Sequence, residues 1–377
     1  MEKGPNESEK YIIDTLENET ERLIQQFGAS RISDLREVPE FKAFKNGLLY
    51  SHRDFDKFYN KLRSGQKSAI VSGLNPSGTL HIGHIGIFDT ILHFQKSHDT
   101  ETFIPISDDE SYVAKKVETQ EEALKNALML TRSMIAYGFE PKKTKVVIDQ
   151  IYTNIYNFAI KLSKGVNLST INAVYDYKTS ESVGLHFYPS VQAAHVLFPQ
   201  TLGIKNVLVP IGPDEDAHLR VCRDVAAKYG YEAPAVVHNK YLPGIEGSKM
   251  SKSKNNAIFL LEEKSSIKKK TMNAFSGGRT SIEEHRKLGG IPENDVAYIY
   301  LKYYFLEEIE SENLYHKYKK GELLSGDMKN LLLEKIMDRV EKLRAAYEKV
   351  KPKDIDKMLM KNEDVDVVSI VEKMGIC

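Results

Sequence analysis

The sequence predicts an α/β protein, with a Rossmann-like, doubly wound parallel sheet followed by an all-helical C-terminal domain. Up to about residue 260, short apolar segments typical of buried strands alternate with long helical patterns. Strands joined by helices of this length form parallel sheets. After residue 260 the strand patterns stop and only helical ones continue. We therefore expect an N-terminal helical appendage over 1–64, a Rossmann-like catalytic domain over 65–260 and a helical domain over 261–377.

Two helices are predicted in the N-terminal appendage. Apolar residues recur at helical spacing across 12–27, which is typical of an amphipathic helix. Before the second helix, Ser51 and Asp54 have the Ser-x-x-Asp spacing that resembles a capping box. Apolar residues then recur at helical spacing across 55–62.

The predicted sheet begins with a buried strand at 68–73, followed by a loop over 74–78 and a helix over 80–94. Pro105 lies inside the next predicted strand and argues against its full extent, because proline cannot donate a ladder hydrogen bond. The remaining strands are predicted at 102–106, 145–148, 207–211 and 235–238, with long helices at 121–137 and 214–229. Helices of the C-terminal domain are predicted at 262–275, 281–288, 296–305 and 328–350.

The composition predicts a soluble, cytoplasmic protein. Two cysteines, Cys222 and Cys377, cannot form a disulfide framework and suit a reducing compartment. No stretch approaches the roughly 18 apolar residues that a membrane span needs, and the N-terminus lacks an apolar signal core. The 53 basic and 53 acidic residues balance. This balance argues against a DNA or other non-specific nucleic-acid binder, but a structured RNA needs only a local basic patch.

A first motif, Asn-Pro-Ser-Gly-Thr-Leu-His-Ile-Gly-His at 75–84, lies where a strand leads through a loop into a helix. Ligands of parallel sheets bind beyond the carboxyl ends of the strands, where helix N-termini attract phosphate. His81 and His84 are three residues apart, and both can donate hydrogen bonds to phosphate oxygens. Gly83 leaves room for a nucleotide to approach the backbone.

A second motif, Lys-Met-Ser-Lys-Ser at 249–253, lies far downstream in a small, polar segment. A loop of this composition can close its lysines over a triphosphate, with Mg²⁺ bridging the phosphates. Nucleotidyl transfer needs mainly positioning and neutralisation of the leaving pyrophosphate. Taken separately, the motifs have plain alternatives, a chance pair of surface histidines and a solvated turn. Together and in this order they indicate one ATP site.

The two motifs match, without substitution, the hallmark motifs of the class I aminoacyl-tRNA synthetases, which the chain resembles. Within that class it is most similar to the tryptophanyl-tRNA synthetases of archaeal and eukaryotic type, over roughly 45–350. Further matching segments lie at 50–54, 107–110, 189–194 and 212–215. The segment 274–286 also matches, and in the family it belongs to the anticodon-binding part.

The resemblance implies a tryptophan–tRNA ligase that forms AMP. Tryptophan and ATP, with Mg²⁺, would give tryptophanyl-adenylate and pyrophosphate, and the acyl group would then move to tRNA(Trp). Family members are homodimers, so we expect a homodimer, in the cytoplasm and without membrane or DNA partners. A metal site built by the protein itself is not expected.

The resemblance also implies roles for individual residues. The catalytic set is His81, His84, Lys249 and Lys252. ATP contacts, besides these four, are expected from Asn75, Ser77, Gly83, Gly212, Asp214, Met250 and Ser251. The amino-acid pocket is expected to hold Val71, Gly73, Glu110, Gln192 and Glu215. The tRNA contacts expected are Arg279, Arg286 and Lys287.

The chain departs from the family in the side-chain pocket. Val71 stands where eukaryotic members have tyrosine, and Pro105 and Glu215 stand where they have glutamines. An indole needs one acceptor for its N–H, and Glu110 or Glu215 could supply it. Two alternatives stay open at this point. One is a tyrosyl-tRNA synthetase, in which Tyr175 or Asp176 could meet the phenolic hydroxyl, and the other is a tRNA-binding homologue that does not charge.

Overall fold

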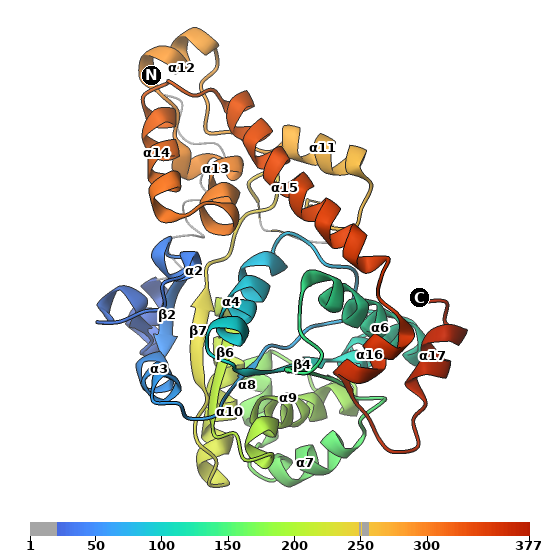
Figure 1. Ribbon diagram of the computed structural model, residues 1–377. Helices are drawn as coiled ribbons and strands as arrows, with labels where there is room; N and C mark the ends of the chain where they lie inside the picture. Colours follow the sequence, from blue (N-terminus) through green and yellow to red (C-terminus); the bar gives the residue numbers. More distant parts are fainter. Residues whose placement is uncertain (1–20, 249, 251–255) are drawn as a thin grey trace. The chain divides into compact units, whose positions relative to one another are not determined.

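The protein is described from a computed structural model, which covers residues 21–248, 250 and 256–377 (Figure 1). The chain divides into two compact units. The first unit comprises Met1–Ser51, Leu80–Thr90 and His238–Leu343, and the second comprises His52–Thr79, Ile91–Val237 and Arg344–Cys377. Of the predicted N-terminal helix, 21–27 is helical and the part before it lies outside the described residues. The three domains expected at 1–64, 65–260 and 261–377 stay a prediction.

The chain forms an eight-stranded sheet in the order β1-β2-β7-β6-β3-β4-β5-β8. The strands are β1 Ser30–Arg31, β2 Leu49–Arg53, β3 Ser68–Val71, β4 Glu101–Ile106, β5 Thr144–Ile148, β6 Asn206–Ile211, β7 Ala235–Asn239 and β8 Leu359–Met360. Within the second unit, β6 with β3, β3 with β4, β4 with β5 and β5 with β8 pair in parallel. The predicted parallel sheet is confirmed.

Helices of the second unit cover both faces of its strands. On one face, α7 (Asn154–Ser163), α9 (Val183–Thr201) and α10 (Asp216–Lys228) share a buried apolar cluster with β3, β4, β6 and β7. On the other face, Asn206 of β6 donates to the Phe58 carbonyl of α3 (Phe55–Arg63) at 3.1 Å. There too, Gln95 of α4 (His84–Ser97) donates to the hydroxyls of Thr102 and Thr144. This two-sided cover is the doubly wound arrangement.

Strand β4 runs its full predicted length even though it contains Pro105. Val71, the last residue of β3, pairs with Phe103, so Pro105 lies beyond the end of β3. The Pro105 carbonyl points to this side, where it accepts from the Leu74 N–H at 2.8 Å. The N–H and C=O of one strand residue point to the same side, so an N–H at position 105 would also face the side of β3. Because β3 has already ended there, the absence of this N–H removes no hydrogen bond between β4 and β3.

Two predicted helix starts are wrong. Ser51 lies in β2 and its hydroxyl contacts Nδ1 of His238 at 2.9 Å, so it does not cap α3. Asp54 precedes α3 in a left-handed conformation, with φ of 55°, and makes no capping hydrogen bond. Helix α4 begins at His84 rather than Leu80, because the preceding residues bond to a distant segment. The Ile82 N–H donates to Ile258, and the Leu80 carbonyl accepts from Leu260.

The helical segments of the first unit are α2 Lys42–Lys45, α11 Lys264–Met272, α12 Ile282–Leu288, α13 Val296–Tyr300, the π-helical turn Leu301–Phe305, α14 Glu308–Lys319 and α15 Ser325–Tyr347, which continues into the second unit. The four helices predicted in the C-terminal part are present with shifted ends, as α11, α12, α13 with the π-helical turn, and α15. Buried Asp295 organises this region. It caps α13 through the Tyr298 N–H at 3.0 Å and accepts from the Tyr318 hydroxyl at 2.8 Å. Burial raises the pKa of Asp295.

The last residues of the chain return to the second unit. Helix α16 (Pro352–Met358) packs against α6 (Gln120–Tyr137) and α17 (Val367–Lys373) (Figure 1). Strand β8 follows α16 and pairs with β5. A two-residue strand leaves no periodic pattern, which is why the sequence predicts only helix here. The other helices of the second unit are α5 Asp108–Val113 and α8 Leu168–Tyr175, and short 3₁₀ turns lie at Ile32–Asp34, Pro213–Glu215 and Pro292–Asn294.

Candidate functional site

The first motif begins in the second unit, where the loop after β3 is bonded to the end of β4. Leu74 donates to the Pro105 carbonyl at 2.8 Å and accepts from the Ser107 N–H at 3.0 Å. Asn75 follows, and its Nδ2 donates to Oε2 of Glu110 at 2.5 Å. The start of the motif is thereby fixed to the first turn of α5, which begins at the carboxyl end of β4.

The histidines of the first motif lie in the first unit, with ring centroids 4.0 Å apart. The His81 N–H donates to Nδ1 of His84 at 3.1 Å, and the Gly83 N–H donates to Nδ1 of His81 at 3.2 Å. When Nδ1 accepts, the neutral ring carries its proton on Nε2. The His81 ring therefore carries its proton on Nε2, as a donor that suits phosphate oxygens. Nδ1 of His84 also lies 3.1 Å from the His81 carbonyl, and in the tautomer that donates there its proton is on Nδ1.

The two motifs meet in the first unit. A Cβ on Gly83 would lie 2.9 Å from Cε1 of His81 and 3.4 Å from Sδ of Met250, so a side chain at this position would displace the ring. Met250 is the one residue of 249–253 within the described part of the chain. Lys249, Ser251 and Lys252 lie outside it, and their expected roles stay predictions.

Glu110 is already bonded on both oxygens. Lys116 donates to Oε1 at 2.7 Å and to Oε2 at 2.9 Å, and Asn75 donates to Oε2 as well. The carboxylate is buried, with 11% of its side chain exposed, whereas 43% of the Lys116 side chain is exposed. Lys116 was not among the residues expected from the sequence, where a lysine beyond the end of a short helix gives no signal.

Glu215 and Gln192, both expected in the amino-acid pocket, are hydrogen-bonded to each other. Gln192 donates to Oε2 of Glu215 at 3.2 Å and accepts from the Tyr175 hydroxyl at 2.9 Å. Nδ1 of His218 contacts the same Glu215 oxygen at 2.8 Å, and its ring stacks on Tyr175 with centroids 4.0 Å apart. Burial opposes ionisation, but the bonds from His218 and Gln192 and the charge of Lys116 keep the pKa of Glu215 below its usual range.

The other expected contacts of the second unit lie at strand ends. Val71 ends β3 and packs in the buried apolar cluster, and Gly73 follows it beside the Pro105 carbonyl. Ser77 is half-buried in the motif loop. Gly212 and Asp214 follow β6, and Asp214 is exposed. Their roles stay predictions.

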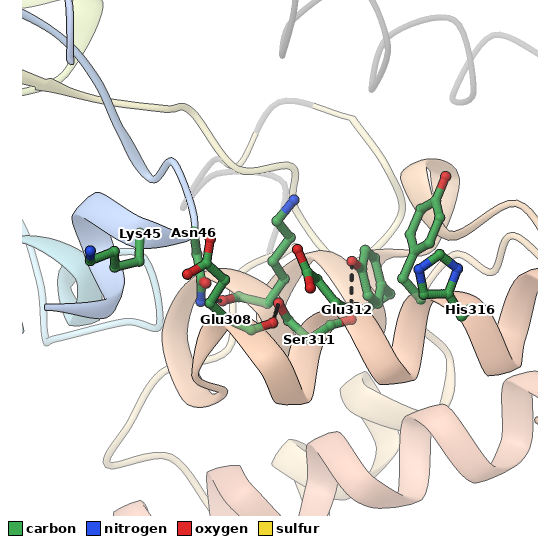
Figure 2. A pocket seen from close by; sticks show the side chains of 9 residues that line it. Lys45, Asn46, Glu308, Ser311, Glu312 and His316 are labelled. Carbon is green, nitrogen blue, oxygen red and sulfur yellow. Dashed lines mark hydrogen bonds between the residues drawn. The ribbon is translucent and has the colours of Figure 1, made fainter. Parts of the chain in front are cut away.

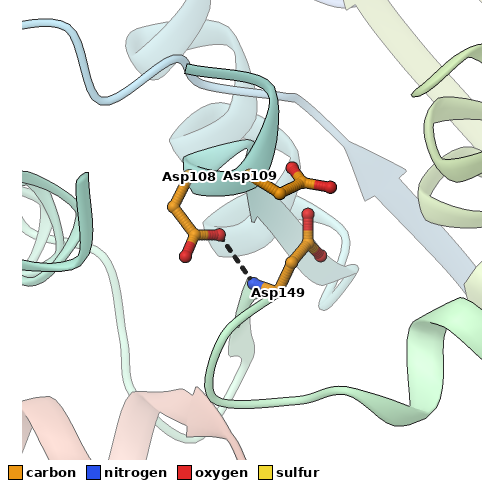
Figure 3. A group of neighbouring side chains, drawn as sticks. All are labelled: Asp108, Asp109 and Asp149. Carbon is orange, nitrogen blue, oxygen red and sulfur yellow. Dashed lines mark hydrogen bonds between the residues drawn. The ribbon is translucent and has the colours of Figure 1, made fainter. Parts of the chain in front are cut away.

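A cluster of three aspartates lies where β4 and β5 end side by side (Figure 3). The carboxyl groups of Asp109 and Asp149 face each other, whereas Asp108 accepts from the Asp149 N–H at 2.9 Å. Oδ1 of Asp149 contacts Nε2 of His195 at 2.7 Å, and both side chains are almost fully buried. One oxygen from each aspartate lies within 4.8 Å of the other two, a spacing that a metal ion could use.

The charge state of this cluster follows from burial. Burial, together with the charge of Asp149, raises the pKa of Asp109 to about 8. Burial lowers the pKa of His195 to about 4, so its ring is neutral and donates to Asp149. Burial also raises the pKa of Asp149. Between them, the two facing carboxyl groups therefore hold at least one proton at neutral pH. One signal for this cluster is visible in the sequence, because acidic residues follow within one to three positions of the ends of two predicted strands.

The arginines expected to contact tRNA are bonded within the first unit. Nε of Arg279 donates to the Gly289 carbonyl at 2.8 Å. Nη1 of Arg286 donates to the carbonyls of Gly321 and Glu322 at 2.8 and 2.7 Å. Lys287 is exposed on α12. Contact of these three side chains with tRNA stays a prediction.

A pocket that the sequence does not predict lies in the first unit, and its lining residues belong to neither motif (Figure 2). Its volume is about 330 Å³, and its wall carries both charge signs. The lining residues are Lys45, Asn46, Tyr298, Lys302, Glu308, Ser311, Glu312, Tyr315 and His316. One wall is rigid, because Asn46 donates to the carbonyls of Lys302 and Leu306 at 2.6 and 2.8 Å.

A doubly wound parallel sheet whose first central strand is followed in the sequence by a His-x-x-His motif is typical of nucleotide-binding α/β proteins. The chain belongs to the class I tRNA synthetases (W and Y), whose family model matches residues 63–341. The resemblance seen in the sequence is thereby confirmed. Among the described residues, none of the helices is both long and apolar enough to span a membrane.

Relatives from archaea and eukaryotes match nearly the whole chain. A tryptophan–tRNA ligase of Methanocaldococcus jannaschii is 34% identical over 346 residues, which are 88% of this chain and 92% of that protein. The cytoplasmic tryptophan–tRNA ligase of Saccharomyces cerevisiae is 33% identical over 362 residues, 90% of this chain and 84% of that protein. The crystal structure of Plasmodium falciparum tryptophanyl-tRNA synthetase aligns with a TM-score of 0.82 and 30% identity, covering 90% of this chain and 96% of that one.

Proposed function

We infer that this chain is a tryptophan–tRNA ligase, which activates tryptophan with ATP and transfers it to tRNA(Trp). The observation that carries this inference is the meeting of the two motifs in the first unit, at Gly83 and Met250. It is supported by relatives of that name at 33–34% identity along most of the chain. A tyrosyl-tRNA synthetase is not favoured, because the Tyr175 hydroxyl is already bonded to Gln192.

In the first step, a carboxylate oxygen of tryptophan attacks the α-phosphorus of ATP. A new P–O bond forms, the bond to the β-phosphate bridging oxygen breaks, and pyrophosphate leaves. The imidazoles of His81 and His84 would stabilise phosphate charge, and Lys249, Ser251 and Lys252 would close on the pyrophosphate. Mg²⁺ enters with the nucleotide as MgATP. Asn75, Ser77, Gly212, Asp214 and Met250 are the further ATP contacts that we propose.

In the second step, a ribose hydroxyl at the 3′ end of the tRNA attacks the acyl carbonyl. The ester forms and AMP leaves. We assign tRNA binding to the helices of the first unit that carry Arg279, Arg286 and Lys287. We propose that the enzyme acts as a homodimer. We also propose that it works in the cytoplasm, which the name of its cytoplasmic yeast relative supports.

ATP–pyrophosphate exchange, screened over all amino acids, tests the function. Tryptophan should support exchange and tyrosine should not. Binding has an independent readout, because the chain contains no tryptophan of its own, and indole fluorescence therefore reports the ligand alone. Exchange with tyrosine alone would establish the tyrosyl enzyme. tRNA binding without exchange for any amino acid would establish a homologue that does not charge.

A further inference from the structure

The run of three lysines at 268–270 divides between the surface and the interior of the first unit. The first two lysines of the run are exposed on α11, whereas Lys270 is buried, with 10% of its side chain exposed. Nζ of Lys270 donates to the Ala257 carbonyl at 2.8 Å and to Oε2 of Glu262 at 2.7 Å. Lysine is rarely buried without such partners. Lys270 is therefore part of the protein interior, bonded to the segment that follows the second motif.

A short antiparallel pairing joins this segment to the first motif. His81 and Phe259 form the central pair. The two hydrogen bonds that flank it run from the Ile82 N–H to the Ile258 carbonyl, at 2.8 Å, and from the Leu260 N–H to the Leu80 carbonyl, at 2.9 Å. A pair between two such bonds is a non-hydrogen-bonded pair, in which side chains come closest. The rings of His81 and Phe259 accordingly meet edge to face, with centroids 6.1 Å apart.

Lys270 and Glu262 complete the other edge of the same segment. Successive backbone groups of a paired strand point to opposite sides, so the Ala257 carbonyl and the Phe259 N–H face away from the first motif. The carbonyl accepts from Nζ of Lys270, and the N–H donates to Oε1 of Glu262 at 3.1 Å. The buried ion pair thus takes the place that a neighbouring strand would have in a sheet.

The Phe259 ring contacts both Lys270 and His81. Nζ of Lys270 lies 5.1 Å from the centroid of this ring, which is within cation–π distance. The His81 ring meets the same ring at an interplanar angle of 89°. The position of the His81 imidazole is therefore set from two directions, by the Gly83 N–H at Nδ1 and by the Phe259 ring.

We propose that Lys270 is a positioning residue for the adenylate-forming step, which fixes the Phe259 ring and through it the His81 imidazole. This proposal rests on the proposed function, because it assumes that His81 meets the phosphates of ATP. Lys270 itself touches no substrate. Its ion pair with Glu262 sets where the segment 257–260 lies against the first motif. A small displacement of a group that stabilises the transition state can slow a reaction by about 100-fold.

The test is a double-mutant cycle between Lys270 and His81, measured as kcat/KM for ATP in pyrophosphate exchange. Lys270→Met keeps the apolar part of the side chain and removes its charge and its donors. In the wild-type background it should lower kcat/KM for ATP by about 10- to 100-fold. In a His81→Ala background it should lower this value by no more than about twofold, because the ring that Lys270 positions is already gone. Lys269→Met, an exposed neighbour on α11, is the matched control and should change neither value.

Phe259→Leu gives an independent variant. It leaves the bonds of Lys270 to Glu262 and to the Ala257 carbonyl in place and removes only the aromatic contact with His81. Its loss of kcat/KM for ATP should show the same dependence on His81. The double variant Lys270→Met with Glu262→Gln avoids an unpaired buried carboxylate and should behave as Lys270→Met does. Circular dichroism and thermal unfolding show whether Lys270→Met is folded, and if it is not, Phe259→Leu decides.

Equal losses in the wild-type and His81→Ala backgrounds would overturn the proposal, because a general effect on stability does not depend on one histidine. An unchanged kcat/KM for ATP in the deciding variant would overturn it as well. Failure of the proposed function looks different, since the wild type would then exchange pyrophosphate with no amino acid. The same variants would in that case be compared in binding of MgATP by calorimetry, where the same dependence on His81 is expected.

Discussion

Replacing Asp109 with asparagine tests whether Asp109 and Asp149 share a buried proton. Burial and the Asp149 charge raise the pKa of Asp109 to about 8, whereas an aspartate of an unfolded chain titrates near ~3.9. Between these pH values, the folded protein holds a proton that the unfolded chain has lost. The free energy of unfolding that this group contributes is therefore fully present below about pH 4, and it is lost as pH rises to about 8.

The magnitude follows from the other groups of the cluster. Burial lowers the pKa of His195 to about 4. Below about pH 6.5 the unfolded chain therefore binds a proton on this histidine that the folded protein does not, which offsets the Asp109 effect. Burial raises the pKa of Asp108 to about 6, so Asp108 has lost most of its proton by about pH 6.5 and adds little above it. For the one proton held by Asp109, the free energy of unfolding should fall from about pH 6.5 to 8 by about 1.4 kcal/mol per pH unit, or about 2 kcal/mol in all.

The assay is urea unfolding, followed by far-ultraviolet circular dichroism across this pH window. The asparagine amide can donate to Asp149 and cannot titrate, so across this window the variant should lose about 2 kcal/mol less stability than the wild type. Asp224→Asn, an exposed change on α10, serves as the matched control and should follow the wild type. An Asp109→Asn protein that loses stability as steeply as the wild type would refute the shared proton.

Three other outcomes follow from the geometry. Gly83→Ala should lower kcat/KM for ATP by about 10- to 100-fold, because its Cβ would displace His81; unchanged ATP kinetics would contradict this placement. Glu215→Gln should raise KM for the amino acid more than KM for ATP in pyrophosphate exchange, and equal effects would remove Glu215 from the pocket. Arg286→Ala should destabilise the protein by about 1–3 kcal/mol through its lost carbonyl bonds, measured by thermal unfolding. If Arg286 also contacts tRNA, KM for tRNA should rise beyond that of an equally destabilised variant.

The buried strands were predictable because their signal is local. Strands β3 to β7 that lie between covering helices read as continuous apolar runs, and the structure confirms the predicted segments. Starts of helices depend on distant partners and were missed. The spacing of Ser51 and Asp54 fits a cap, but pairing in β2 takes Ser51 away.

The candidate site was predictable only in its motifs. The pairing of Ile106 with Ile148 joins two strand ends and brings Asp109 to Asp149, some 40 residues away along the chain. The nearness of Asp109 and Asp149 follows only from the order of the strands in the sheet, which the sequence pattern does not reveal. The contact between Lys116 and Glu110 depends on a left-handed turn at Lys115, a conformation that lysine gives no reason to expect.

The division of the chain has a consequence for how the protein folds. The chain passes between the two units after Ser51, Thr79, Thr90, Val237 and Leu343, so neither unit is a continuous piece of sequence. The second unit is complete only when 344–377 has been made, because β8 supplies an edge of its sheet. During synthesis, the second unit can therefore complete its sheet only after the whole sequence of the first unit has been made. We expect its exposed β5 edge to be the point where a chaperone, or another chain, can bind the unfinished protein.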